Sequence, residues 1–340
     1  MRKIFTYNLP FSLESGEVLP RLEIAYHTYG QFQPGKNNVV WVFHALTANS
    51  DASDWWSGLV GEGKLYNPQD HFIVCANIIG SCYGSTGPLS VNPKSGQPYF
   101  HSFPFITIRD MVNAHRLLRQ FLGIGKIQFG LGGSMGGYQL LEWAIQEPDL
   151  FENIVLLATS AKESAWGIAI HTAQRMAIES DATWKEEQVH AGKNGLKTAR
   201  GIGMLTYRNY ETFVKAQSDS DERIRDFSAD SYIRYQGDKL SMRFNAFSYY
   251  TLSRAMDSHD ISRNRISPEV ALQKIKSKTL VIGISSDILC PPAEQEFLAK
   301  TIPDATLSII DSSYGHDGFL IEFKAISEQI SSRFGDLIRY

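Results

Sequence analysis

The chain has 340 residues, of which 43% are apolar and 20% charged, and its formal net charge at pH 7 is −3. These values exclude a mainly disordered chain, a collagen-like fibre and a disulfide-rich mini-protein. Without a basic excess, nucleic acid is not expected as a partner. Three widely spaced cysteines, Cys75, Cys82 and Cys290, argue against a disulfide framework and favour a reducing compartment.

The sequence also bears on location. The first residues lack the apolar run of a signal peptide, and no stretch of about 18 apolar residues occurs without a charge. We therefore expect a cytoplasmic protein that has no membrane partner.

The N-terminal half alternates between predicted strands and helices. The first 30 residues predict a β-meander, with a turn at Ser15-Gly16 and a half-buried strand over 22–29. Continuous apolar runs predict strands buried on both faces of a parallel sheet. These runs cover 39–43, 71–76, 127–131 and 154–158. A helix over 108–122, ended by Gly123, lies between the second and third of these strands.

The pattern changes after residue 159. Apolar spacing then predicts helices only, over 171–178, 196–207, 210–217 and 244–256. Strands resume over 279–284 and 306–310, and a last helix covers 321–334. We therefore predict an α/β core formed by 1–159 and 277–340, with a mostly parallel sheet covered on both faces by helices. A helical lid is inserted over 160–276.

One short motif predicts the chemistry. Gly132-Gly133-Ser134-Met135-Gly136 matches G-x-S-x-G, follows a predicted strand and precedes a helix predicted over 138–146. That context is typical of the nucleophile elbow of the α/β-hydrolase fold, in which a tight turn lifts the serine hydroxyl clear of the sheet. We predict that Ser134 is a nucleophile.

A serine nucleophile needs a base and an orienting acid, which follow it along the chain in this fold. Of the four histidines after Ser134, only His316 follows the last predicted strand, so it is the predicted base. Asp287 follows the preceding strand and is the predicted acid. Asp311 is the rival, but it stands only five positions before the histidine.

The oxyanion hole needs two convergent backbone N–H groups. We assign one to Met135, directly after the nucleophile, and the other to Leu46, in the loop after the 39–43 strand. His44 in that loop is interpreted as structural. Two aromatic pairs, Trp55-Trp56 and Tyr249-Tyr250, are interpreted as packing residues.

The chain resembles the homoserine O-acetyltransferase family. The stretches that carry the resemblance span nearly the whole sequence. They include 44–47, 54–56, 77–88, 103–104, 107–112, 132–137, 174–178, 235–239, 255–257, 286–287, 291–292 and 315–317. The resemblance implies an α/β-hydrolase of methionine biosynthesis. It also implies a ping-pong reaction in which Ser134 takes the acetyl group of acetyl-CoA and passes it to the hydroxyl of L-homoserine.

An amino-acid acceptor is a zwitterion, so its pocket should present a cation and an anion. Asp317, next to the base, can hold the ammonium group. The resemblance implies Arg200 for the carboxylate, with Tyr207 nearby, and we also assign Thr47 to substrate binding. Arg175 and Arg109 are weaker alternatives to Arg200. The resemblance also implies that the lid helices pair two subunits into a homodimer.

Several alternatives remain open. A succinyl donor or a serine acceptor would use the same chemistry, and a carboxylesterase would use the same triad without Arg200 or Asp317. A non-catalytic relative is disfavoured because all three triad members are present. No His/Cys cluster has metal-ligand spacing, so neither a metal nor a cofactor is expected beyond acetyl-CoA as the donor substrate. The CoA nucleotide site cannot be placed from the sequence.

Overall fold

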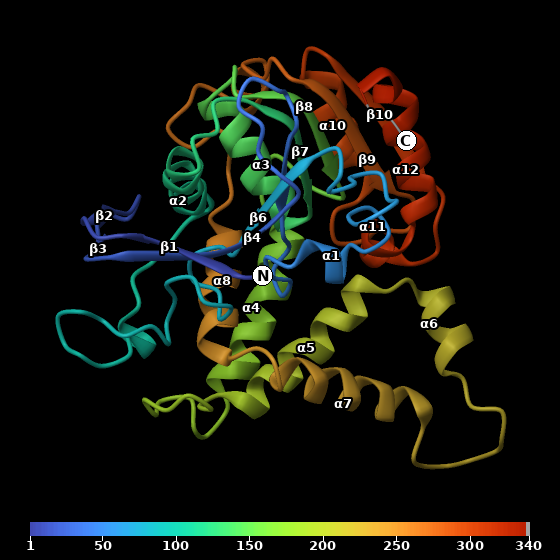
Figure 1. The fold of residues 1–340 in the computed structure, drawn as a ribbon. Helices are drawn as coiled ribbons and strands as arrows, with labels where there is room; N and C mark the ends of the chain where they lie inside the picture. Colours follow the sequence, from blue (N-terminus) through green and yellow to red (C-terminus); the bar gives the residue numbers. More distant parts are fainter. Residues whose placement is uncertain (338–340) are drawn as a thin grey trace.

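The computed structural model describes residues 1–337, and its centre is an eight-stranded sheet in the order β1-β4-β6-β5-β7-β8-β9-β10 (Figure 1). The pairs β1–β4 and β4–β6 are antiparallel, and all other neighbouring strands are parallel. The strands of this sheet are β1 (Lys3–Tyr7), β4 (Leu22–Tyr29), β5 (Val39–Phe43), β6 (Phe72–Ala76), β7 (Ile127–Gly133), β8 (Phe151–Leu157), β9 (Lys278–Ile284) and β10 (Ala305–Ile310). The strands β2 (Phe11–Ser12) and β3 (Val18–Leu19) form a separate hairpin.

The sheet has a packed core on each face. Every residue of β5 is buried, and alternate side chains enter different clusters: Trp41 and Phe43 one, Val40 and Val42 the other. This is the expected result of a two-residue side-chain period. The first cluster is covered by α2 (Ile108–Phe121), α3 (Met135–Gln146) and α10 (Pro292–Thr301); the second by α1 (Ala52–Trp55) and α12 (Phe323–Phe334).

The order of the strands indicates where a ligand site should lie. Strand β5 lies between β6 on one side and β7 on the other, so the chain reverses its direction across the sheet at β5. In open α/β sheets, ligands bind beyond the carboxyl ends of the strands at such a reversal. The site is therefore expected where β5 and β7 end.

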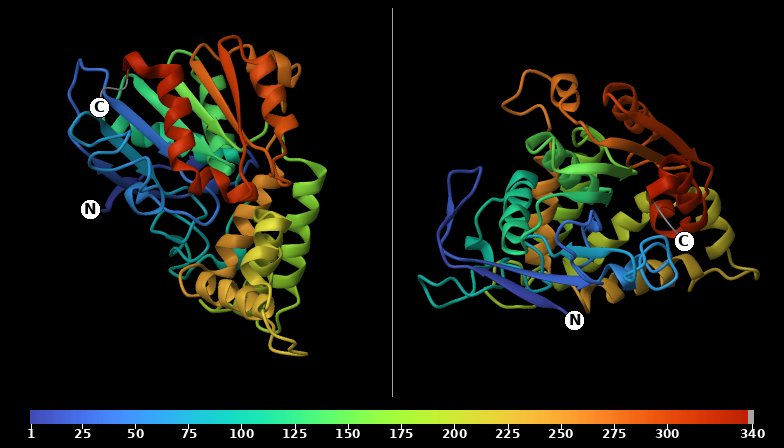
Figure 2. Two further views of the ribbon diagram at one scale, coloured as in Figure 1. Left: turned by 90° about the vertical axis from the view of Figure 1, so that its right-hand side faces the viewer. Right: turned by 45° about the horizontal axis from the view of Figure 1, so that its top comes forward.

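A group of helices lies beyond one end of the sheet (Figures 1 and 2). Helix α5 packs against α4 and α7, and α8 packs against α4. We call this group the lid helices: α4 (Ala165–Glu179), α5 (Lys193–Tyr207), α6 (Tyr210–Gln217), α7 (Ser228–Ser241) and α8 (Ala246–Asp257). The remaining short elements are η1 (Phe100–Ser102), α9 (Pro268–Leu272), η2 (Gly315–Asp317), α11 (Gly318–Ile321) and η3 (Gly335–Leu337).

Helices α7 and α10 were not predicted. Their buried faces are small: α7 buries only Gly237, Leu240 and Ser241, and α10 only Gln295 and Leu298. A helix that buries so few apolar side chains shows little periodicity in its sequence.

Several predicted bounds are corrected. Helix α4 begins six residues before the predicted 171, because Ser164 caps it by accepting a hydrogen bond from the Gly167 N–H. Helix α3 begins at Met135, directly after the nucleophile, rather than at 138. Strand β8 covers Phe151–Leu157 rather than 154–158, and α12 begins at Phe323 because the separate turn of α11 precedes it.

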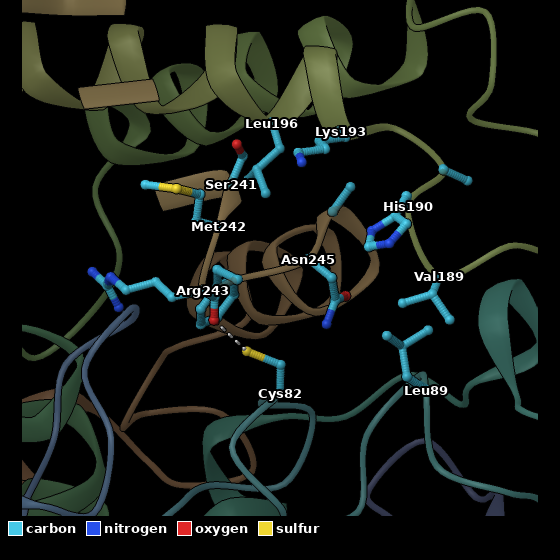
Figure 3. A pocket seen from close by; sticks show the side chains of 13 residues that line it. Cys82, Leu89, Val189, His190, Lys193, Leu196, Ser241, Met242, Arg243 and Asn245 are labelled. Atoms are coloured by element: carbon cyan, nitrogen blue, oxygen red, sulfur yellow. Dashed lines mark hydrogen bonds between the residues drawn. The ribbon is translucent and has the colours of Figure 1, made fainter. Parts of the chain in front are cut away.

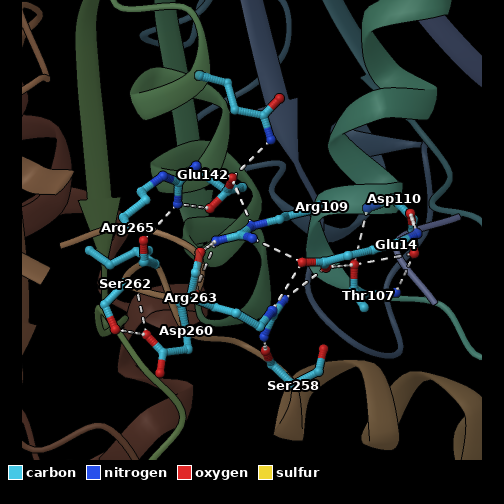
Figure 4. A network of polar contacts seen from close by, with 12 residues as sticks. Glu14, Thr107, Arg109, Asp110, Glu142, Ser258, Asp260, Ser262, Arg263 and Arg265 are labelled. Atoms are coloured by element: carbon cyan, nitrogen blue, oxygen red, sulfur yellow. Dashed lines mark hydrogen bonds and ion pairs between the residues drawn. The ribbon is translucent and has the colours of Figure 1, made fainter. Parts of the chain in front are cut away.

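A buried polar network connects residues 258–267, the segment between α8 and α9, to the core (Figure 4). We call this segment the return segment. The Glu142 carboxylate on α3 contacts Arg109 of α2 at 3.2 Å and Arg265 of the return segment at 2.5 Å. Glu14 contacts Arg109 at 2.9 Å and Arg263 at 2.8 Å. Because α3 starts at the predicted nucleophile, this network fixes the return segment to the helix that carries the site.

Removing the centre of this network should destabilise the fold. The Glu142 side chain is only 2% exposed, so Glu142→Ala leaves two largely buried guanidinium groups without their carboxylate. We expect the free energy of unfolding to fall by about 3–5 kcal/mol, as when one partner of a buried ion pair is removed. Urea unfolding measures this, with Glu296→Ala on the exposed face of α10 as the control. Equal unfolding midpoints for the two variants would contradict the structural role given to Glu142.

Within residues 1–337, no helix is long and apolar enough to cross a membrane. The same residues contain no group of three or more His, Cys, Asp or Glu side chains arranged to hold a metal ion. All three cysteines are free thiols.

Candidate active site

Ser134 occupies a strained turn between β7 and α3. Its φ of +54° and ψ of −126° lie outside the regions that ordinary residues favour. The motif glycines allow the turn: a Cβ on Gly132 would lie 2.4 Å from the Gly136 carbonyl oxygen, and one on Gly136 would lie 2.2 Å from that of Phe43. The turn therefore requires both glycines, as the nucleophile-elbow motif predicts.

The structure brings the three predicted triad residues together. The Ser134 Oγ lies 2.9 Å from His316 Nε2, and His316 Nδ1 lies 2.7 Å from Asp287 Oδ2. All three residues are buried, with exposures of 7% or less. The arrangement is that of a nucleophile, a general base and a carboxylate that orients the base.

Asp287 rather than Asp311 supports the base. The second oxygen of Asp287, Oδ1, accepts hydrogen bonds from the N–H groups of Leu289 and Cys290 at 2.8 and 2.9 Å. These two donors fix the orientation of the carboxylate. Asp311 instead accepts a hydrogen bond from the Ser285 hydroxyl and is exposed.

The electrostatics of His316 suit a general base. Burial lowers the pKa of this imidazole, but the hydrogen-bonded Asp287 carboxylate, together with Asp317 and Glu163, raises it, and the net shift of the pKa is upward. Asp287 thus stabilises the imidazolium that forms when the serine loses its proton.

The two predicted oxyanion donors flank the nucleophile. Leu46 lines the same cavity as Ser134, and Met135 begins α3. Within residues 1–337, neither backbone N–H donates to another protein atom, so both are available to an oxyanion.

Sequence reasoning missed the residue that connects these donors. The Gln139 amide nitrogen donates to the carbonyl oxygens of His44 and Met135, at 3.3 and 3.1 Å. Its amide oxygen lies 3.1 Å from His115 Nε2. Gln139 therefore links the loop that carries Leu46 to the first turn of α3. Its position one helical turn after Met135 is a weak signal in the sequence.

His44 has the structural role expected of it. It is fully buried, and its Nε2 accepts a hydrogen bond from the Ile78 N–H at 3.1 Å. Burial lowers the pKa of His44 to about 4, so the ring is neutral near pH 7. Both ring nitrogens face backbone groups, which leaves none for a substrate.

A cavity of about 400 Å³ opens above the serine between the core and the lid helices. Thr47 and Trp55 line it from the core, and Trp55 therefore faces the cavity instead of acting only as a packing residue. Trp56 and Tyr249 are fully buried, as expected for packing residues. The lid side of the cavity is lined by His171, Arg200, Tyr207, Arg243 and Met256.

Arg200 is a cation without a carboxylate partner among residues 1–337. Its guanidinium carbon lies 5.5 Å from the centre of the Tyr207 ring, and that ring lies 6.1 Å from the His316 ring. Its Nε is buried and has no hydrogen-bond partner in the described part of the chain. The two alternatives are engaged elsewhere, since Arg175 pairs with Asp257 and Arg109 joins the Glu142 network. Arg200 is therefore the cation best placed for an anionic group of a ligand.

Asp317 lines the same cavity but is already paired. Its Oδ2 lies 3.1 Å from Arg208 Nε, a contact that the sequence did not predict. Burial raises the pKa of the Asp317 carboxyl, while the nearby Arg208, His316 and Arg200 act in the opposite direction. The cavity that contains Ser134 and His316 thus presents both an acidic and a basic side chain.

Comparisons with known proteins agree with this architecture. The family profile described as alpha/beta hydrolase fold matches residues 38–323. A homoserine O-acetyltransferase of Cyclobacterium marinum is 50% identical over 331 residues, which cover 97% of this chain and 94% of that protein. Among solved structures, a homoserine O-acetyltransferase from Bacillus anthracis superposes with a TM-score of 0.90 at 22% identity, covering 98% and 96% of the two chains. Esterase E22 superposes with a TM-score of 0.88, also at 22% identity, covering 98% and 99%. At these identities the two superpositions establish the shared fold.

Proposed function

The chain belongs to the homoserine O-acetyltransferase family within the α/β-hydrolase fold, and from this premise we propose that it acetylates the side-chain hydroxyl of L-homoserine with acetyl-CoA. The product is O-acetyl-L-homoserine, an intermediate of methionine biosynthesis. The observation that carries the proposal is the juxtaposition of the Ser134–His316–Asp287 triad with unpaired Arg200 and acidic Asp317 in one cavity.

The first half-reaction loads the enzyme. His316 Nε2 takes the proton of Ser134 as Oγ attacks the thioester carbonyl carbon of acetyl-CoA. The negative oxygen of the tetrahedral intermediate is held by the N–H groups of Leu46 and Met135. The C–S bond then breaks, the sulfur leaves with the proton from His316, and Ser134 carries an acetyl ester.

The second half-reaction transfers the acetyl group. His316 removes the proton of the homoserine hydroxyl, whose oxygen attacks the acetyl-serine carbonyl carbon. Collapse of the intermediate releases O-acetylhomoserine and returns the proton to Ser134 Oγ. Neither step needs a metal or a redox cofactor.

The cavity must favour homoserine over water. Arg200 holds the carboxylate of the amino acid and Asp317 its ammonium group, with Tyr207 and Thr47 completing the pocket. Fixing both ends of the zwitterion places its hydroxyl near His316, and this positioning competes with hydrolysis of the acetyl-enzyme by bulk water.

The decisive experiment measures release of the CoA thiol from acetyl-CoA with and without L-homoserine. Homoserine-dependent release supports the proposal. Release that depends on L-serine instead, or on succinyl-CoA, would keep the mechanism and change the acceptor or donor. Release that ignores every amino acid would favour a carboxylesterase-like hydrolase and overturn the acceptor pocket.

Arg200→Ala tests the acceptor pocket directly. Loss of a charged hydrogen-bonded partner at a desolvated site costs several kcal/mol, so kcat/KM for homoserine should fall about 100-fold. Hydrolysis of a small acetyl ester should survive, because the triad is untouched. Steady-state kinetics with both substrates measure the difference, with Arg234→Ala on the exposed face of α7 as the control. If transfer and ester hydrolysis fall by the same factor, Arg200 is not the carboxylate ligand.

We also propose a cytoplasmic homodimer that pairs through the lid helices. Apolar side chains on α5, α6 and α7, and at the residue that precedes α7, are 41–79% exposed: Leu205, Tyr210, Val214, Phe227 and Tyr235. Burying such a patch against a second copy would remove it from water. Leu205→Glu should therefore lower the mass measured by light scattering from dimer to monomer, whereas Ile266→Glu, exposed but outside the lid helices, should not. A wild-type monomer would contradict the proposal.

A further inference from the structure

A second pocket lies beside the catalytic cavity, with a volume of about 200 Å³ (Figure 3). Cys82 and Leu89 line it from the loop after β6, His190 from the turn before α5, and Lys193 from the first residue of α5. Arg243, between α7 and α8, lines both this pocket and the catalytic cavity. The two spaces are therefore neighbours that share one arginine.

Among its mostly apolar lining, the pocket presents three basic side chains, His190, Lys193 and Arg243, and no carboxylate of the described residues lines it. Within residues 1–337, the Lys193 ammonium group has no hydrogen bond or ion pair, and only Nη1 of the Arg243 guanidinium is engaged, by the Thr47 carbonyl at 2.5 Å and the Tyr83 hydroxyl at 2.6 Å. Five other basic residues of the lid region are paired with carboxylates: Arg175, Lys197, Arg208, Arg223 and Arg234. The absence of such a partner around Lys193 and Arg243 leaves a local excess of positive charge.

The positive charge comes from side chains rather than from the helix end. The N–H groups of Asn194 and Gly195, in the first turn of α5, already donate to the Asp181 carboxylate at 2.8 and 2.9 Å. Asp181 does not line the pocket. An anion bound there would therefore be held by Lys193, Arg243 and His190.

We propose that this pocket binds the phosphate groups of the acyl donor, CoA. The inference rests on the proposed function, because it names the place where the acetyl-CoA of that reaction is anchored. While the thioester reaches Ser134, the phosphates must lie outside the catalytic cavity. A neighbouring cationic pocket that shares Arg243 meets this requirement, and phosphate groups are the ligands that unpaired Lys and Arg side chains recognise.

Lys193→Glu tests the pocket without touching the triad or the acceptor site. Two donors are compared: acetyl-CoA, and S-acetylpantetheine, which carries the same thioester without phosphate. Reversing the charge of the half-buried Lys193 should raise KM for acetyl-CoA about three- to tenfold and leave kcat unchanged. KM for S-acetylpantetheine should not change. Lys185→Glu, an exposed residue outside the pocket, makes the same change in net charge and should affect neither donor.

A second variant and a ligand without a thioester complete the test. Adenosine 3′,5′-bisphosphate should inhibit the wild type competitively against acetyl-CoA, and more weakly as salt rises, because ions screen exposed charges. The exposed His190→Glu should weaken this inhibition, as should Lys193→Glu. Equal effects on the two donors, or no effect on acetyl-CoA in folded and active variants, would overturn the pocket assignment alone. Failure of the wild type to transfer from either donor would overturn the proposed function itself.

Discussion

Ser134→Ala is expected to lower kcat for acetyl transfer about 10⁵- to 10⁶-fold, close to the loss of the whole triad in serine hydrolases. Alanine has no oxygen to attack the thioester, and water in its place would lack the 2.9 Å contact that aligns Oγ with His316. Both half-reactions pass through this oxygen. Release of CoA and formation of acetylhomoserine should therefore disappear together.

Two measurements check this expectation. A pre-steady-state burst of CoA without homoserine should appear in the wild type and vanish in Ser134→Ala, and an acetyl group should be found on Ser134 by mass spectrometry. Ser313→Ala, an exposed serine near the histidine loop, is the control. If Ser134→Ala still acetylates homoserine at a measurable fraction of the wild-type rate, transfer occurs directly between the two substrates and the acyl-serine mechanism is wrong.

The triad could be predicted because each member has a local signal. Ser134 lies in a motif whose glycines are required by contacts shorter than 3 Å. Asp287 and His316 follow apolar runs that became β9 and β10, and the order of residues along the chain left few candidates. Strand ends in a parallel sheet meet at one edge, so position along the chain predicted proximity in space.

Contacts across the cavity had no such signal. Arg208, which pairs with Asp317, ends α5 more than a hundred residues away in sequence. Arg243, in the connection between α7 and α8, donates a hydrogen bond to the Thr47 carbonyl oxygen in the loop that also carries Leu46. Such pairs depend on how the lid helices pack on the core, and helices with few buried residues, such as α7, left little pattern to predict that packing.

The unpredicted contacts change how the acceptor pocket is understood. Since Arg208 already contacts one Asp317 oxygen, the ammonium group of homoserine would share the carboxylate rather than meet a free one. Arg200 has no such competitor among the described residues. Of the two zwitterion contacts, the one to Arg200 should therefore contribute more to discrimination between substrates.

Asp287→Asn is the second substitution with a large expected effect. An asparagine keeps the shape of the side chain, but the N–H groups of Leu289 and Cys290 now hold Oδ1 in place, so the amide nitrogen would face His316 Nδ1. The ring would then present the wrong tautomer to Ser134. We expect kcat to fall about 10⁴-fold, as when the corresponding acid is replaced in serine proteases.

The pH dependence separates this explanation from a general loss of structure. The base acts in its neutral form, so kcat/KM should fall as the pH drops through the pKa of His316. The Asp287 carboxylate keeps that pKa above its ordinary value despite burial. Without the Asp287 carboxylate, burial lowers the pKa of His316 and only the charges of Asp317 and Glu163 oppose it, so the acidic limb of the pH–rate profile should move to lower pH. A profile with an unmoved limb, in a variant that unfolds at the wild-type urea concentration, would mean that Asp287 does not control the charge of His316.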